Sequence, residues 1–495
     1  MNALLVCPEF PDTFWSFKHA LKFIRKSSSL PPLGLLTVAA MLPDHWNRRL
    51  RDLNVSSLTD ADLRWADCAF VGAMAIQQTS AKRVLARCRE AGVRTVAGGP
   101  LFTSEPDAFP EVDHLVLNEA ETTLPRFLDD LRQGRPERVY ATTEHPTIDA
   151  TPPPLWELAE RGRYASMSIQ YSRGCPFACE FCNVTSLFGR RPRVKTAAQV
   201  IAELDRLHEL GWTGRVFFVD DNLIGNKRPL RTELLPALIE WRRGKRGFQF
   251  YTEASINLAD DPALMAMMVE AGFDTVFVGI ETPSDESLAE CSKKQNRNRD
   301  LVEDVKRIQR AGMQVQGGFI VGFDSDTATI FDRQIDFIQQ SGIVTAMVGL
   351  LQAPTGTSLY SRLARERRLL GPMSGDNVDG STNIVPRMDV HTLMEGHRKI
   401  LRRIYRPSAY YGRVRTFLRE YALAGGGRWA RPSLSDVLAS IRSVLRLGIL
   451  GRERFHYWML LSWTALRRPT LLPLAITLAI TGHHCRRICE KHLQL

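Results

Sequence analysis

Short apolar segments alternate with helical segments over the first 360 residues, and this alternation restricts the possible fold more than any other feature. Turn-forming residues bound each apolar segment, as expected for buried parallel strands. This order indicates an open, doubly wound α/β domain over residues 1–135, in which ligands bind beyond the carboxyl ends of the strands. The predicted strands there are 3–7, 50–54, 68–75, 95–97 and 114–117, and the predicted helices are 32–41, 80–91 and 124–133.

A second alternating region covers residues 166–360. Its six predicted strands are spaced so that one helix fits between each pair, which is typical of a partial (β/α)6 barrel with its active site at the carboxyl ends of the strands. Residues 136–165 are rich in Pro, Arg and Glu and are predicted to be a linker, and residues 361–495 are predicted to be helical. The six strands are 166–172, 216–219, 248–254, 275–279, 315–321 and 347–351.

Composition is that of a globular protein with a large core, because 44% of the residues are hydrophobic and 24% are charged. Nine cysteines in 495 residues are too few for a disulfide-stabilised chain. The start of the chain has no basic segment typical of a secretory signal, and the apolar run 471–480 is too short for a hydrocarbon core of about 30 Å. We therefore expect a cytoplasmic protein.

Three cysteines form a Cys-x3-Cys-x2-Cys run: Cys175, Cys179 and Cys182. Three thiolates on one loop can bind three corners of a cubane and leave the fourth iron open. Zinc is the alternative, but structural zinc sites close with four ligands, and no fourth Cys or His lies nearby. The run therefore predicts an open [4Fe-4S] site. The basic residues that follow it either balance the charge of this cluster or form a solvated loop: Arg190, Arg191, Arg193 and Lys195.

This run, with Phe181 before its third cysteine, resembles the signature of the radical S-adenosylmethionine (SAM) superfamily. The resemblance covers residues 166–352 and implies that polar residues at successive strand ends bind SAM. Each of these alone is equally typical of a helix cap or a close packing point. The implied SAM-binding residues are Asp220 and Asp221 after the second strand, Glu253 and Glu281 at the third and fourth, and Gly318 and Gly322 at the fifth.

The first domain resembles the cobalamin-binding domain of class B radical SAM enzymes. The similarity rests on Pro31-Pro32-Leu33-Gly34-Leu35, on the turn before Pro100, and on 117–121 (Leu-Asn-Glu-Ala-Glu). No Asp-x-His-x-x-Gly motif is present, so a lower axial histidine is not expected. A loop that only caps the next helix is the alternative for 77–79. The implied cobalamin-facing residues are Gln77, Gln78, Thr79, Gly98, Gly99, Asn118 and Glu119.

Together the resemblances imply a cobalamin-dependent radical SAM methyltransferase, similar to the subgroup of hopanoid C-2 methylases. Such an enzyme methylates an unactivated carbon of a small molecule or lipid through a 5′-deoxyadenosyl radical and methylcobalamin. Ring formation, ring contraction or oxidation without methyl transfer is the alternative. The cluster loop argues against a cobalamin-sensing regulator. An RNA methylthiotransferase is disfavoured because such enzymes usually carry a second cysteine trio in the N-terminal domain. Here the N-terminal cysteines, Cys7, Cys68 and Cys88, lie on separate elements. The sequence identifies no catalytic acid or base.

The last 95 residues carry 17 Lys and Arg against four Asp and Glu. This asymmetry suits peripheral contact with an anionic membrane surface, at the inner membrane face. A solvated helical face is equally compatible, whereas nucleic acid is a less favoured partner. The resemblance also implies an external one-electron donor of the flavodoxin or ferredoxin type. The interleaved aromatic residues are Trp429, Tyr457, Trp458 and Trp463.

Overall fold

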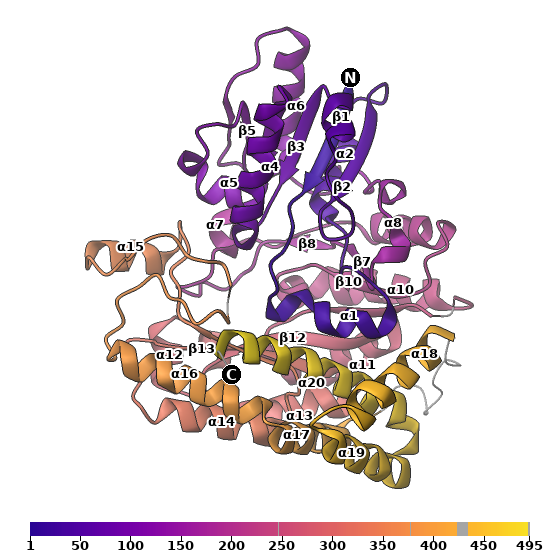
Figure 1. Cartoon of the computed structure of the whole chain (residues 1–495), viewed down its shortest axis with the longest axis vertical. Helices are drawn as coiled ribbons and strands as arrows, with labels where there is room; N and C mark the ends of the chain where they lie inside the picture. The colour runs from indigo at the N-terminus through magenta and orange to yellow at the C-terminus, as the bar shows by residue number, and fades with distance from the viewer. Residues whose placement is uncertain (246, 377, 423–433, 494–495) are drawn as a thin grey trace.

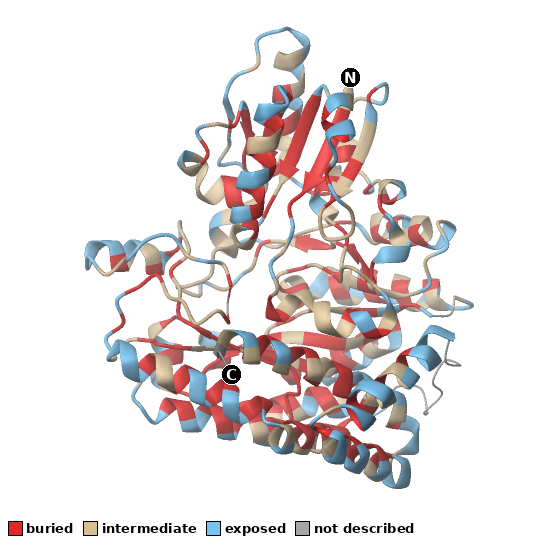
Figure 2. Ribbon diagram, in the orientation of Figure 1, coloured by how far each residue is buried: buried red, intermediate tan, exposed pale blue. Residues whose placement is uncertain are grey.

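The computed structural model describes residues 1–245, 247–376, 378–422 and 434–493. Two parallel sheets and a helical C-terminal region make up the fold, with the first sheet above the second in Figure 1. Buried strands form the centre of both sheets, and exposed positions lie on the surrounding helices (Figure 2). Trp429 lies outside the described residues.

The first sheet has the strand order β2-β1-β3-β4-β5-β6 and is parallel throughout. Alternate residues of β1 enter two different cores: Leu5 packs with α2 and α6, and Leu4 packs with α3, α4 and α5. Helices therefore cover both faces, as the doubly wound prediction requires. The elements are β1 (Asn2–Cys7), α2 (Leu33–Met41), β2 (Asn47–Asp52), α3 (Asp60–Trp65), β3 (Cys68–Gly72), α4 (Gln78–Glu90), β4 (Arg94–Gly98), α5 (Pro100–Ser104), β5 (His114–Val116), α6 (Ala120–Arg132) and β6 (Val139–Tyr140).

The second sheet contains the six strands predicted for the barrel, paired in chain order and all parallel. Within the described residues the edge strands β7 and β14 do not pair with each other, so the barrel is open. Its elements are β7 (Ser166–Ile169), α8 (Ala197–Glu209), β10 (Arg215–Phe218), α10 (Leu235–Arg242), β11 (Gln249–Glu253), α11 (Pro262–Ala271), β12 (Phe273–Glu281), α12 (Asp285–Glu290), α13 (Leu301–Ala311), β13 (Gln314–Val321), α14 (Ile330–Ser341), β14 (Ala346–Leu350) and α15 (Ser358–Arg365).

The C-terminal region is helical and packs on the outside of the open barrel, chiefly against α14. None of the described helices is long and apolar enough to cross a membrane. The helices are α16 (Val390–Tyr405), α17 (Pro407–Glu420), α18 (Leu434–Ser443), the π-helical segment η11 (Val444–Ile449), α19 (Arg454–Arg467) and α20 (Leu472–Leu493).

One segment was not anticipated from the sequence. Residues 8–31, here called the strap, leave the first sheet after β1 and carry η1 (Phe14–Ser16) and α1 (Lys18–Ile24). In Figure 1 the indigo α1 lies beside the yellow α20, and α1 packs against both α18 and α20. The strap thus joins the N-terminal sheet to the C-terminal helices. The short strand β6 similarly extends the first sheet into the predicted linker.

A buried arginine fixes the C-terminal helices to the barrel. The Arg413 guanidinium on α17 donates to the Ile404 carbonyl at 2.9 Å, to the Val344 carbonyl at 3.1 Å and to the Gln339 side chain. It also lies within 6 Å of the ring centroids of Tyr405 and Tyr410.

We expect Arg413→Leu to destabilise the protein by about 2–4 kcal/mol, because it leaves buried hydrogen-bond acceptors without a donor. Thermal unfolding monitored by circular dichroism would show a lower Tm. The control is Arg403→Leu on the exposed face of α16, for which we expect a change within about 0.5 kcal/mol. Equal Tm values for the two variants would contradict this role of Arg413.

Candidate active site

The three cysteines lie on a loop closed at its base by a short antiparallel pair, β8 (Ser172–Arg173) and β9 (Arg193–Val194). Gly174 follows β8 with a φ of 93°, and a Cβ there would lie 3.0 Å from three carbonyl groups. Only glycine fits this turn. The sequence therefore fixes how the chain enters Cys175.

Amide side chains face the thiols from the end of β10 and from the loop between α12 and α13. Asn222 Nδ2 lies 4.0 Å from the Cys175 sulfur, and Gln295 Nε2 lies 3.7 Å from the Cys179 sulfur. Gln295 Oε1 is buried without a hydrogen-bond partner in the described structure. Burial raises the pKa of Cys182 to about 12, so a bound cation is needed to hold it as thiolate at neutral pH.

The loop fits a cubane cluster better than a single metal ion. Among the described residues, no three His, Cys, Asp or Glu side chains converge on one ion-sized point. In a cubane each thiolate binds a different iron, so convergence on one point is not required. Three thiolate ligands on one loop, with amide N–H groups facing their sulfurs, therefore suit a cubane cluster.

A lysine balances the charge of this region. Lys293 Nζ lies 2.6 Å from Glu281 Oε1. Burial lowers the pKa of Lys293, but attraction to Glu281 and to the Cys179 and Cys182 sulfurs outweighs burial and raises it overall. Two of the four basic residues predicted to follow the cysteine run pair elsewhere, Arg193 with Glu119 and Lys195 with Glu203, so neither is free to face the cluster as its counter-charge.

Carboxylates from β10 and β11 gather beside the thiols. Burial raises the pKa of Asp220 to about 7 and of Asp221 to about 6. Burial and then repulsion from Asp221 and Asp220 raise the pKa of Glu253 to about 8. A cationic ligand would be stabilised here, because it relieves this repulsion.

Asp220 differs from its neighbours, since its oxygens are already used. It accepts hydrogen bonds from the backbone N–H of Tyr171 at 3.2 Å and from the N–H and hydroxyl of Ser172. Asp220 therefore holds the turn between β7 and β8 that leads to Cys175. Asp221 and Glu253 are the freer carboxylates for a ligand.

Glu281 lies at an irregular end of β12. Its φ is 64°, and the pairing with β13 shifts register between Gly279 and Glu281. A Cβ on Gly279 would lie 2.3 Å from Glu281 Oε1, so glycine there admits the ion pair with Lys293.

The two glycines predicted for the fifth strand occupy different places. A Cβ on Gly318 would lie 2.8 Å from Phe277 Cζ, so Gly318 keeps the space beside that ring open. Gly322 has a φ of 105°, and its N–H donates to Asp326. Gly322 therefore shapes the strand end, and Gly318 borders the interior of the barrel.

The carboxyl edges of the two sheets face each other. The strap brings Trp15 edge-on to Phe277 of β12, with ring centroids 5.3 Å apart. Gly375, on the loop after α15, lies against the backbone of Ile76 next to β3. In the order β2-β1-β3, β2 lies on one side of β1 and the later strands lie on the other, so the order of the strands reverses between β1 and β3. Doubly wound sheets bind ligands at this point.

The predicted cobalamin residues all lie at this edge of the first sheet, with different tasks. Gln77 is buried and turned inward, donating to the Pro8 carbonyl and accepting from Met74 N–H. Gln78 bonds Glu105, and Thr79 is exposed. A Cβ on Gly98 would clash with a backbone carbonyl oxygen, and Gly99 has a φ of 92°, so both positions require glycine. Asn118 also has a positive φ, of 63°.

Glu119 forms an ion-pair network with the cysteine loop. Its carboxylate lies 2.9 Å from Arg173, 2.8 Å from Arg193 and 3.2 Å from His145. Glu121 pairs with the same Arg173 at 2.8 Å. These side chains connect the first sheet to the base of the cysteine loop.

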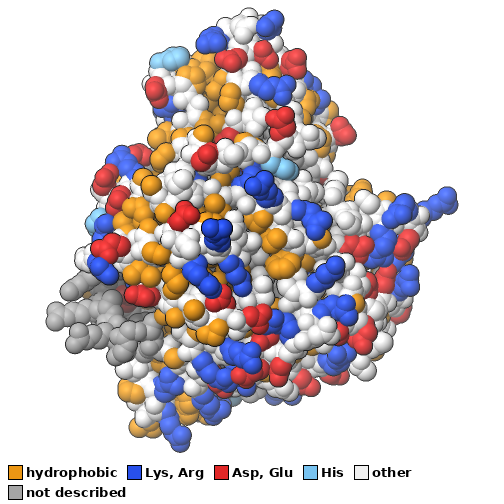
Figure 3. All heavy atoms as spheres, turned by 180° about the vertical axis from the view of Figure 1, so that it is seen from behind, with side chains coloured by type: hydrophobic (Ala, Val, Ile, Leu, Met, Phe, Trp, Pro, Cys, Tyr) orange, Lys and Arg blue, Asp and Glu red, His pale blue; other side chains and the backbone are white. Residues whose placement is uncertain are grey.

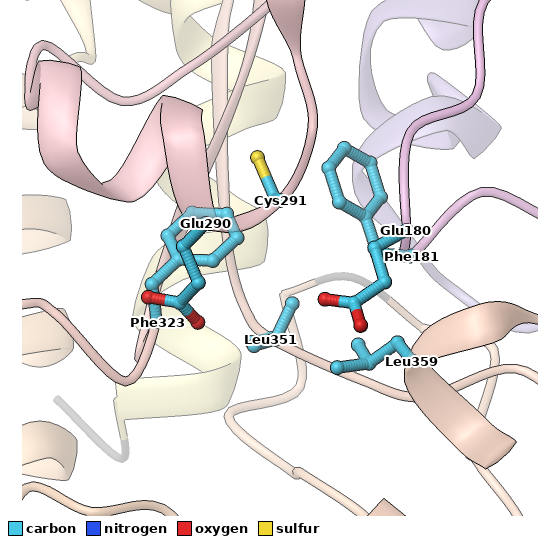
Figure 4. Close-up of a pocket in the computed structure, with 7 residues that line it drawn as sticks. All are labelled: Glu180, Phe181, Glu290, Cys291, Phe323, Leu351 and Leu359. Atoms are coloured by element: carbon cyan, nitrogen blue, oxygen red, sulfur yellow. The ribbon is translucent and has the colours of Figure 1, made fainter. Parts of the chain in front are cut away.

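A small pocket lined by apolar side chains and two glutamates lies behind the cysteine loop (Figure 4). Phe181 points into it, with its ring centroid 6.3 Å from that of Phe323. Glu180 is held by Arg362 of α15 at 2.8 Å, and its N–H donates to the Cys291 carbonyl at 2.9 Å. The aromatic before the third cysteine thus anchors the loop. The pocket is lined by Glu180, Phe181, Glu290, Cys291, Phe323, Leu351 and Leu359.

The profile of the radical SAM superfamily matches residues 169–338, and that of a domain of unknown function (DUF4070) matches residues 357–495. Hopanoid C-2 methylase from Rhodopseudomonas palustris is 35% identical over 92% of this chain and 88% of its own. The chain belongs to the radical SAM superfamily, in the family of this methylase. An uncharacterized methyltransferase from Synechocystis is 39% identical over 98% of this chain and 91% of its own.

Two solved structures are similar in fold. The radical SAM methyltransferase TsrM from Kitasatospora setae gives a TM-score of 0.57 at 15% identity, over 93% of this chain and 98% of that chain. The cobalamin-dependent radical SAM enzyme OxsB gives 0.61 at 15% identity, over 100% of this chain and 84% of that chain. The predicted fold class is confirmed. So are the predictions of a radical SAM enzyme and of the superfamily's cofactors, a [4Fe-4S] cluster and SAM.

Four residues of the site were missed from the sequence: Lys293, Gln295, Asn222 and Arg173. Lys293 lies two residues after Cys291, in the loop that follows α12. A lysine in a loop at the carboxyl edge of the barrel is a usable signal, because a cluster of thiolates needs nearby positive charge. Asn222 and Arg173 gave no local signal, since their partners lie far away in the sequence.

The raised pKa of Glu253 predicts a pH-dependent gain in stability for Glu253→Gln in the protein without SAM. The folded pKa of about 8 exceeds the usual 4.5, so folding binds a proton between these pH values and wild-type stability falls as pH rises through this window. A glutamine side chain does not ionise, so the variant does not lose stability in this way as pH rises. We expect Glu253→Gln to raise Tm more at pH 8.5 than at pH 6.

The control is Glu270→Gln, an exposed position on α11, for which the difference from wild type should not change with pH. An equal gain for Glu253→Gln at both pH values would contradict a pKa of about 8.

Proposed function

We propose that this protein is a cobalamin-dependent radical SAM enzyme that methylates an unactivated carbon of a small apolar molecule or lipid. One observation carries the proposal: the cysteine loop and the ligand-binding edge of a doubly wound sheet face the same space at the barrel opening. The name of the R. palustris relative, hopanoid C-2 methylase, supports a hopanoid-like substrate.

The roles that we propose follow the geometry. Cys175, Cys179 and Cys182 hold the cluster, Lys293 offsets its charge, and Gln295 faces Cys179 as an amide donor. Asp221, Glu253 and Glu281 receive the cationic and ribose parts of SAM, with Gly318 and Gly322 giving its adenine close access to the backbone. Asp220 positions the loop. When bound, the cluster and SAM supply a 5′-deoxyadenosyl radical, and cobalamin supplies the methyl group.

For cobalamin we propose the edge formed by the loops after β1, β3, β4 and β5. Gln78, Thr79, Gly98, Gly99 and Asn118 remain candidates to face it. Gln77 supports the loop from within, and Glu119 acts through its ion pairs. The division into a cobalamin-binding domain (1–135), a linker (136–165), a radical SAM barrel (166–360) and a basic helical region (361–495) is part of this proposal.

The residues around the opening support an apolar substrate. Trp15 and Phe277 meet edge-on, and Met347 Cε lies 3.7 Å from the position of a Cβ on Gly318. Since these side chains offer dispersion contacts and few hydrogen bonds, they suit a hydrocarbon skeleton. We also propose a cytoplasmic protein with peripheral contact at the inner membrane face, supplied with electrons by a flavodoxin or ferredoxin.

The assay uses anaerobically purified protein reconstituted with iron, sulfide and hydroxocobalamin. With SAM, reductant and a lipid extract, we expect 5′-deoxyadenosine and S-adenosylhomocysteine in similar amounts, because one SAM is cleaved and another donates methyl. Mass spectrometry quantifies both and reveals a methylated lipid by its mass. Deoxyadenosine without homocysteine product would favour ring formation, contraction or oxidation instead.

Cys179→Ala should abolish both products and lower the bound iron, because the cluster loses one of its three ligands. The matched control is Cys88→Ala, a buried cysteine of the first domain, which should keep full iron content. Normal deoxyadenosine formation by Cys179→Ala would contradict the cluster assignment.

A further inference from the structure

Exposed apolar side chains concentrate on one part of the C-terminal region. Seventeen large hydrophobic residues are exposed among those described, and eleven of them lie between Leu434 and Leu466. Leu450 is 79% exposed, Phe455 77% and Leu466 85%. Monomeric soluble proteins rarely gather so many apolar side chains at one place on their surface.

These residues form a face, here called the apolar face, on two consecutive helical segments. Along α18 and η11 they recur at three- and four-residue spacing, and along α19 they repeat the same pattern. The opposite sides of the helices are buried, for example at Ser443, Leu447 and Tyr457. The apolar face is formed by Leu434, Val437, Leu438, Ile441, Leu445, Ile449, Leu450, Phe455, Trp458, Met459 and Leu466.

The charges around the apolar face are mostly positive. Arg446, Arg454 and Arg467 are exposed on the same helical segments, and Arg452 is exposed in the turn between η11 and α19. Glu453 is buried and paired with Arg486, which leaves Asp436 as the exposed carboxylate between 434 and 468. Figure 3 shows hydrophobic side chains at the lower left, next to the grey residues, with Lys and Arg side chains nearby.

We propose that the apolar face docks on the surface of an anionic lipid bilayer, with α18 and α19 lying in the headgroup region. This inference rests on the peripheral membrane contact proposed above and extends it, because it assigns binding to apolar insertion by named helices. Arginines beside an apolar stripe are complementary to anionic headgroups over acyl chains.

The strap connects this face to the barrel opening. Arg442 of α18 donates to the Phe23 carbonyl of α1, and the Arg446 guanidinium lies 5.4 Å from the Phe23 ring centroid. The same strap brings Trp15 to Phe277. A lipid leaving the bilayer at the apolar face is therefore near the segment that borders the proposed substrate site.

Flotation of the full-length holoenzyme tests the proposal, with vesicles of phosphatidylglycerol and phosphatidylethanolamine. We expect a triple variant, Leu438→Gln, Leu445→Gln and Phe455→Gln, to bind the vesicles with an affinity at least about tenfold lower than that of the wild type. The matched control replaces three exposed apolar residues elsewhere, Leu370→Gln, Val385→Gln and Val390→Gln, and should bind like wild type. Neutral phosphatidylcholine vesicles should recover less wild-type protein.

Equal flotation of the triple variant and wild type would overturn the assignment to the apolar face while leaving peripheral contact in place. Equal recovery on neutral and anionic vesicles would overturn the proposal that the face binds an anionic lipid surface. A wild-type dimer that the triple variant converts to monomer, with no vesicle binding by either, would assign the face to a second copy of the chain. Because flotation needs no turnover, these results are independent of the methylation assay, and circular dichroism verifies that the variants are folded.

Discussion

The position of the cysteine loop depends on a buried ion-pair network between the two sheets. Arg173 precedes Gly174 and Cys175, is 12% exposed and pairs with both Glu119 and Glu121. Removing one partner of such a pair leaves a buried charge that costs several kcal/mol. The network therefore holds the loop in one place relative to the first domain. Its acidic members come from the turn that resembles the cobalamin-domain signature, so that turn has an architectural task of its own.

Acidic side chains gather at the barrel opening, and a cationic ligand bound there would relieve the repulsion between them. Asp220, Asp221 and Glu253 have raised pKa values, with Lys293 as a nearby counter-charge. SAM carries a sulfonium and an ammonium group, and both would relieve the repulsion. The same burial that raises these pKa values strengthens each interaction with the bound cation, since little water screens it.

Features of the fold that depend on local sequence patterns could be predicted from the sequence. All six barrel strands and four of the first five strands of the N-terminal sheet (β1, β3, β4 and β5) occur where short apolar runs lie between turn residues, and the cysteine loop is recognisable from spacing alone. The exception is β2, which is mostly polar and begins three residues before the predicted strand 50–54. Roles that depend on distant partners were not accessible. Asp220 matched a ligand-binding motif, but its oxygens bond Tyr171 and Ser172, and Gln77 turned inward toward the loop after β1. The strap had too short a helix to give a clear periodicity.

The strap also has a consequence for how this architecture can vary among relatives. Residues 27–29 pair with 163–166 just before and at the start of β7, so the segment is connected to the barrel as well as to α18 and α20. A recombination event that exchanges residues 1–135 therefore carries Trp15 and α1 with it. Because Trp15 reaches Phe277 from this segment, such an exchange would replace the domain proposed to hold cobalamin together with one wall of the proposed substrate site.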